Sequence, residues 1–256
     1  EPCISGETGS GTVFFSGCVL RCVYCQNHNI AESRAGRIIG WERLSEIFLE
    51  LQDKKANNIN LVTPTHFVPQ IALALERAKL GGLDIPVVYN TGSYERVETL
   101  KRMEGLVDIY LPDLKYMSSR LGERYSHAAD YFETASAAIA EMVRQTGEPD
   151  FDDKSGLMKK GVIVRHLVLP GCTADSKKVI SYLYHTYGDR IYISIMNQFT
   201  PVCDLSSFPE LNRRITAREY EKIVDYALDI GVENGFIQEG NTAEESFIPE
   251  FDGEGL

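Results

Sequence analysis

The chain has 256 residues, of which 43% are hydrophobic, and its formal net charge at pH 7 is −11. This length is enough for one sizeable core, and the acidic balance argues against a large nucleic-acid-binding surface. No apolar run approaches the roughly 20 residues of a membrane-spanning helix, and six cysteines are too sparse for a disulfide-linked scaffold. We expect a cytoplasmic protein that contacts neither membrane nor nucleic acid.

Two kinds of segment alternate along the chain. Short apolar runs predict buried strands at 12–15, 58–62, 85–90, 106–111, 161–169 and 190–196. Helical spacing of apolar residues predicts helices at 41–55, 67–82, 130–147 and 176–188. The last three of these end at glycine, a common helix stop. Residues 147–156 form an acidic loop, and the acidic tail from about 239 is expected to be loosely ordered.

Alternating strands and helices predict a parallel sheet covered by helices, built as one domain over residues 1–256. A partly closed barrel and an open doubly wound sheet both fit this pattern. In either fold, ligands collect at the carboxyl ends of the strands. A cysteine-rich loop follows the first predicted strand, and the polar segments TPTH, NTGS and PDLK follow the next three. The sequence therefore predicts a site at that edge.

The cysteine-rich loop contains Cys18, Cys22 and Cys25 with the spacing C-x3-C-x2-C. Thiolates at this spacing can converge on one soft metal centre. Three interpretations remain open from the residues. The cysteines are buried thiols, or they bind zinc together with His28, or they hold a [4Fe-4S] cluster that leaves one iron open.

The loop, with Tyr24 before its last cysteine, resembles the radical S-adenosylmethionine (radical SAM) enzymes. The closer resemblance is to the glycyl-radical-enzyme activases and relatives of pyruvate formate-lyase activating enzyme. It extends over nearly the whole chain, through FFSGCVLRCVYCQN, PDLKYM and VRHLVLPG. It implies a partial (β/α)6 barrel of parallel strands with the cluster loop after the first strand.

The resemblance also implies a reaction. Cys18, Cys22 and Cys25 would hold a [4Fe-4S] cluster whose open iron binds S-adenosylmethionine. An electron from a flavodoxin- or ferredoxin-like donor would cleave this cofactor to a 5′-deoxyadenosyl radical, which abstracts a hydrogen atom. The substrate would be a glycyl radical enzyme. The alternatives are an enzyme that modifies a small molecule or peptide and, more remotely, a non-catalytic binding module stabilised by zinc.

Several positions carry over from the family as cofactor contacts. By resemblance, the backbone of Tyr24 would lie against the adenine, and Asn27 would lie near the methionyl group. Met196 and Asn197, after the sixth predicted strand, would flank the adenine. Taken alone, Met196 is more often a core residue than a cofactor contact.

Three charged residues would lie at the carboxylate end of the cofactor. By resemblance, Asp113 and Lys115 match the DLK motif of the activases, and Arg165 is a cationic partner. Asp113 and Lys115 could also form an ordinary solvated pair. Arg165 lies within a long apolar run, where a charge needs a partner.

The chain departs from the activases at two strand ends. Their GGEP-like motif, which recognises the cofactor's amino group, is replaced by Thr63-Pro64-Thr65. The carboxylate of that motif is therefore absent. Threonine hydroxyls, or carbonyls that Pro64 leaves unpaired, would accept the hydrogen bonds of the amino group instead. Asn90, before Thr91, stands where the activases often have aspartate. This change weakens the expectation of a monovalent cation beside Asp113.

Overall fold

The structure is a computed structural model that describes residues 1–33, 35–202 and 205–238. The predicted acidic tail therefore lies outside the described residues. The α-helices are α1 (Pro2–Ser5), α2 (His28–Ala31), α3 (Trp41–Asp53), α4 (Val68–Leu80), α5 (Val97–Leu100), α6 (Ser119–Ser126), α7 (Tyr131–Thr146), α8 (Thr173–Tyr187) and α9 (Ala217–Asp229). The strands are β1 (Gly11–Phe14), β2 (Ile59–Val62), β3 (Val87–Thr91), β4 (Ile109–Pro112), β5 (Asp150–Phe151), β6 (Met158–Leu167), β7 (Tyr192–Met196) and β8 (Gly235–Ile237).

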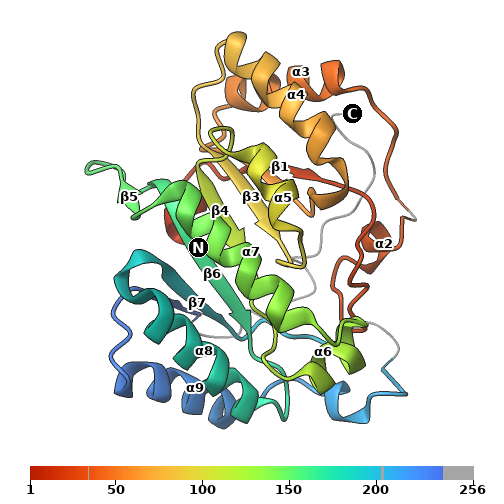
Figure 1. Ribbon diagram of the computed structural model, residues 1–256, viewed down its shortest axis with the longest axis vertical. Helices are drawn as coiled ribbons and strands as arrows, with labels where there is room; N and C mark the ends of the chain where they lie inside the picture. The colour runs from red at the N-terminus through yellow and green to blue at the C-terminus, as the bar shows by residue number, and fades with distance from the viewer. Residues whose placement is uncertain (34, 203–204, 239–256) are drawn as a thin grey trace.

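The strands form one sheet in the order β1-β2-β3-β4-β6-β7-β8, and every neighbouring pair in this order is parallel. The short strand β5 pairs antiparallel with β6 outside this path. Figure 1 shows α7 lying along the sheet, while α2 and α6 lie toward the edge to which the strands point. The predicted α/β fold of parallel strands is confirmed, and it is consistent with a partial barrel.

The two faces of the sheet are both buried, as parallel strands require. On one face, Leu61 and Tyr89 belong to the large core that the helices cover. On the other face, Cys3 and Ile4 of α1 pack in a smaller cluster with residues such as Val88. Since side chains alternate along a strand, the residue two places after Val88 also projects from the α1 face of the sheet. That residue, Asn90, lies at the carboxyl end of β3.

The structure adds elements that the sequence pattern did not predict. Strand β8 has three residues, too few for a periodic signal. Strand β5 has two and lies within the predicted acidic loop 147–156. Helix α6 is a polar eight-residue segment whose N-cap, Ser118, accepts a hydrogen bond from the backbone N–H of Leu121. These short elements depend on the surrounding fold more than on their own composition.

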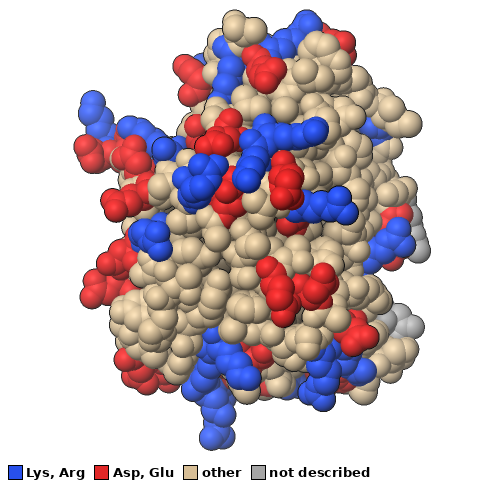
Figure 2. Space-filling model, in the orientation of Figure 1, with Lys and Arg blue, Asp and Glu red and all other residues tan. Residues whose placement is uncertain are grey.

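The molecular surface carries charges of both signs. On the face drawn in Figure 2, acidic and basic side chains are interspersed rather than gathered into a single basic patch. Among the described residues, no helix is both long enough and apolar enough to cross a membrane.

Candidate cofactor site

The cysteine loop joins β1 to α2 and is held on two sides by backbone hydrogen bonds. The N–H groups of Gly17 and Cys18 donate to the carbonyls of Ile30 and Ala31 at 2.8 and 3.0 Å. On the other side, the N–H of Val23 donates to the carbonyl of Tyr125 in α6 at 2.9 Å. The loop is therefore fixed between α2 and α6 at the carboxyl edge of the sheet.

The three loop cysteines form no disulfide and lie at partly buried positions. The N–H of Cys25 donates to the carbonyl of Cys22 at 3.0 Å, which closes a turn between them. Burial raises the pKa of Cys25 to about 12. Burial also raises the pKa of Cys22, although the charge of Lys115 and a hydrogen bond with Ser126 oppose this. Metal binding would have to displace these protons.

The zinc interpretation needs Cys18, Cys22, Cys25 and His28 around one ion. Within the described ranges, no group of three or more His, Cys, Asp or Glu side chains is arranged to hold a single metal ion. The Nδ1 atom of His28 is buried and has no hydrogen-bond partner in the structure. Three thiols are the donor set that suits a cluster with one open iron.

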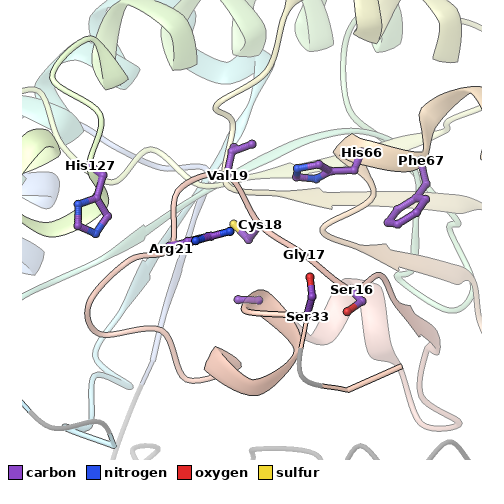
Figure 3. A pocket seen from close by; sticks show the side chains of 10 residues that line it. Ser16, Gly17, Cys18, Val19, Arg21, Ser33, His66, Phe67 and His127 are labelled. Carbon is purple, nitrogen blue, oxygen red and sulfur yellow. The ribbon is translucent and has the colours of Figure 1, made fainter. Parts of the chain in front are cut away.

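A cavity of about 710 Å³ opens beside the cysteine loop. Figure 3 shows Cys18 and Arg21 on the loop, with His66, Phe67 and His127 around the same space. His66 and Phe67 come from the 3-10 turn after β2, and His127 follows α6. Three loops that are distant in sequence therefore meet around Cys18.

A polar cluster lies at the ends of β3, β4 and β6. Arg165 donates from Nε to Oδ1 of Asp113 at 2.9 Å and from Nη2 to Oδ1 of Asn90 at 2.7 Å. Lys115 donates from Nζ to Oδ2 of Asp113 at 2.7 Å. The side chains of Asp113, Lys115 and Arg165 are only 17%, 15% and 18% exposed. Asn90 thus joins the three charged residues, which the resemblance had grouped together, in one network.

The charges in this network sustain one another. Burial by itself would raise the pKa of Asp113, but Arg165 and Lys115 hold that pKa below its ordinary value. Burial would likewise lower the pKa of Lys115, whereas the Asp113 carboxylate raises it well above its ordinary value. Two cations, Arg165 and Lys115, flank the Asp113 carboxylate, and the charge of Glu1 also raises the pKa of Arg165. A ligand carboxylate is the natural complement of such a site.

The cysteine loop and the polar cluster are neighbours. A Cβ atom added at Gly92, just after β3, would meet Leu20 of the cysteine loop at 3.0 Å and Cε of Lys115 at 3.6 Å. A side chain at this position would push Leu20 away by a few tenths of an ångström. Gly92 thereby allows the loop with the thiols and the loop with the charges to pack together.

The hydroxyls of Thr65 and Thr91 converge on a carboxylate that the sequence analysis missed. Glu95 is 3% exposed and accepts hydrogen bonds from Thr65 at 3.0 Å, from Tyr89 at 2.8 Å and from Thr91. The third position, Thr63, has a φ of +57°, which is unusual for a β-branched residue. Glu95 therefore joins the segments after β2 and β3, so a carboxylate lies beside TPTH although none is within it.

The remaining predicted residues lie around the same edge. The Tyr24 side chain is buried, with its hydroxyl 2.5 Å from that of Tyr116. Asn27 precedes α2 as its N-cap residue. Met196 is buried at the end of β7, and the N–H of Asn197 donates to Oε1 of Gln238 at 2.9 Å. Gln26 of the cysteine loop donates to the carbonyl of Gln198 at 2.9 Å, which connects the loop to the end of β7.

Glu95→Gln tests the buried carboxylate through the pH dependence of stability. Burial raises the pKa of Glu95 above its ordinary 4.5, although three hydroxyl donors oppose this. The stability that a raised pKa contributes is fully present below pH 4.5 and is lost as pH rises through the folded value. Glutamine does not titrate, so we expect Glu95→Gln to cost about 1–2 kcal/mol at pH 4.5 and less at pH 7.5, measured by denaturant unfolding.

Glu141→Gln is the matched control, because Glu141 is a buried carboxylate on α7 away from the strand ends. Hydrogen bonds from Arg144 lower the pKa of Glu141 to about 2. Its contribution is present above pH 4.5 and is lost as pH falls, so the cost of Glu141→Gln follows the opposite trend. A Glu95→Gln cost that grows with pH, as the control's does, would show that the raised pKa is wrong.

Comparisons with known proteins identify the family of the chain. Residues 12–183 match the radical SAM superfamily. "Uncharacterized protein MJ0674" of Methanocaldococcus jannaschii is 30% identical over 233 residues, which cover 85% of this chain and 62% of that protein. The chain therefore spans less than two thirds of this relative.

Solved structures share the fold at low sequence identity. The structure of Streptococcus suis SuiB bound to the precursor peptide SuiA has a TM-score of 0.59 and 12% identity, covering 89% of this chain and 48% of that one. A domain of pyruvate-formate lyase-activating enzyme from Bacteroides vulgatus has a TM-score of 0.50 and 14% identity, covering 69% and 94%.

The chain belongs to the radical SAM superfamily, because the family match covers more than half of its length. Membership implies a [4Fe-4S] cluster and S-adenosylmethionine as cofactors. The three thiols of the cysteine loop, and the cations Lys115 and Arg165 beside them, are chemically suited to these two groups.

Proposed function

We propose that Cys18, Cys22 and Cys25 hold the [4Fe-4S] cluster and that the enzyme cleaves S-adenosylmethionine reductively for hydrogen abstraction. When bound, the cluster supplies the electron that breaks the sulfonium bond and releases the 5′-deoxyadenosyl radical. The observation that carries this proposal is the packing of the cysteine loop against Gly92 and Lys115. This packing puts the thiols next to a site with two cations, of which Lys115 is close enough to act on the pKa of Cys22.

The polar cluster would orient the methionyl group. Arg165 and Lys115 supply the charge that would attract its carboxylate, while Asp113 and Asn90 hold the guanidinium in place. Thr63 and Thr65 after β2, with Thr91 at the end of β3, would border its amino group. In this proposal the Thr65 and Thr91 hydroxyls act through Glu95, because they already donate to it.

The adenine would lie at the other side of the cysteine loop. The backbone of Tyr24 and the residues Met196 and Asn197 would contact it, with Asn27 closer to the methionyl group. The hydrogen bond between Gln26 and the carbonyl of Gln198 supports this assignment, because it holds the loop against the end of β7. Met196 is buried there, which suits packing against an aromatic ring system.

For the substrate, we propose a polypeptide, and first the backbone glycine of a partner enzyme, as in the activases. The likeness to a domain of pyruvate-formate lyase-activating enzyme supports this choice. The alternative is the modification of a small molecule or peptide, which the likeness to SuiB bound to its precursor peptide favours. A flavodoxin- or ferredoxin-like protein would supply the electron in both cases.

The experiment is anaerobic reconstitution of the full chain with iron and sulfide, followed by reduction in the presence of S-adenosylmethionine. We expect a brown protein with about four irons per chain that releases 5′-deoxyadenosine only with reductant. Adding a candidate partner should then produce a glycyl radical signal, whereas peptide or small-molecule chemistry gives product without a partner. A colourless, zinc-containing sample that yields no 5′-deoxyadenosine would contradict the proposal.

A further inference from the structure

Behind Cys22 lies a chain of buried hydroxyl groups that the proposed cofactor contacts do not explain. The Sγ atom of Cys22 is 3.0 Å from Oγ of Ser126, which is 3.0 Å from the hydroxyl of Tyr116. The hydroxyl of Tyr116 is in turn 2.5 Å from that of Tyr24. Ser126, Tyr116 and Tyr24 are 1%, 1% and 6% exposed. The chain is therefore almost completely shielded from water.

The three hydroxyls come from different parts of the fold. Tyr24 belongs to the cysteine loop, Tyr116 follows β4, and Ser126 is the last residue of α6. The ring of Tyr116 packs edge-on against Tyr131, with ring centroids 5.5 Å apart. Only the assembled fold brings these groups into line with the thiol.

The protons available on these groups determine which group donates and which accepts in each of the three hydrogen bonds. Each hydroxyl has one proton to donate, whereas a cysteine bound to metal is a thiolate that can only accept. Once Cys22 is a ligand, Ser126 must donate to its sulfur. The oxygen of Ser126 then accepts from Tyr116, and the oxygen of Tyr116 accepts from Tyr24. All three bonds point toward the sulfur, so each polarises the next.

We propose that Ser126, supported by Tyr116 and Tyr24, donates a hydrogen bond to the Cys22 sulfur and raises the reduction potential of the cluster. A hydrogen bond to a ligand sulfur stabilises the reduced cluster, which carries one more negative charge than the oxidised form. The effect is strongest in a dry environment. The inference rests on the proposed role of Cys22 as a ligand.

The test is a redox titration of the reconstituted full chain in the absence of S-adenosylmethionine. Electron paramagnetic resonance measures the fraction of reduced cluster at each potential. Ser126→Ala should shift the midpoint potential to a more negative value, and Tyr116→Phe should shift it less in the same direction. Ser126→Thr keeps the hydroxyl and should restore the potential. Tyr125→Phe is the matched control, because its ring lies 6.3 Å from that of Tyr116 but its hydroxyl donates to Glu210.

Unchanged potentials in both Ser126→Ala and Tyr116→Phe, with full iron content, would overturn the inference. An equal shift in Tyr125→Phe would also overturn it, because the potential would then respond to the loss of any nearby hydroxyl rather than to the hydrogen bonds that lead to Cys22. If Ser126→Ala does not retain iron, Tyr116→Phe decides alone. The proposed role of Cys22 as a cluster ligand has a separate test. It is wrong if Cys22→Ala retains the iron content of the unmodified protein.

Discussion

Cys22→Ala should lose the [4Fe-4S] cluster and reduce the formation of 5′-deoxyadenosine to the level of a sample without reductant. Two remaining thiols cannot hold a cubane that already lacks a fourth protein ligand. The substitution removes one partly buried thiol, so the chain should still fold. Iron and sulfide content, visible absorption and 5′-deoxyadenosine after reconstitution measure the result, and circular dichroism checks the fold.

Cys172→Ala is the matched control for this experiment. Cys172 is also a partly buried free thiol, and it precedes α8 beside Tyr125 and Phe208, in a cavity separate from the one at Cys18. We expect this variant to bind iron and form 5′-deoxyadenosine at the level of the unmodified protein. Cofactor cleavage that persists in Cys22→Ala would show that the loop has been assigned the wrong role.

Arg165→Met should weaken S-adenosylmethionine binding and also destabilise the fold. The guanidinium is hydrogen-bonded to both Asp113 and Asn90, and in the proposed site it attracts the methionyl carboxylate. A hydrogen bond to a charged group contributes about 1.5–3 kcal/mol, which corresponds to a loss of roughly 10- to 100-fold in affinity. Equilibrium binding to the reconstituted protein measures this loss.

The cost to stability of Arg165→Met should be about 2–3 kcal/mol. Removing one partner of a buried ion pair typically costs more, but Lys115 still neutralises Asp113, and these side chains retain some exposure. Arg43→Met on α3 is the control, because it removes a solvent-screened pair with Glu50 and should cost less stability than Arg165→Met. Equal effects of the two substitutions on cofactor affinity would contradict the proposed role of Arg165.

The fold class, and the place of the three cysteines in a loop at the strand ends, were predictable because their signals are local. The spacing from Cys18 to Cys25 is read within a few residues. The apolar runs at β2 and β6 predict strands from their hydrophobic pattern alone. The charge of Arg165 within an apolar run also required a partner. The sequence analysis could place Asp113 near it only by resemblance, and the structure shows the hydrogen bond between them.

Glu95 and Ser126 could not be predicted in the same way. Glu95 reads as an ordinary polar residue between Tyr94 and Arg96, and its burial depends on how the segments after β2 and β3 pack together. Ser126 lies 104 positions after Cys22 along the chain, so no spacing could connect them. Hydrogen-bond partners at such separations are set by topology and packing rather than by local pattern.

By itself, therefore, the sequence determined the chemistry that this protein can hold: three thiols in one loop and polar residues at successive strand ends. Tertiary structure alone decided how these groups meet, through the close approach of Leu20 to Gly92, the ion network around Asp113 and the hydroxyl chain behind Cys22. The physical reason is that residue types define which hydrogen bonds and ion pairs are available. Which of them form depends on burial and mutual distance, and only the folded sheet and its loops provide these.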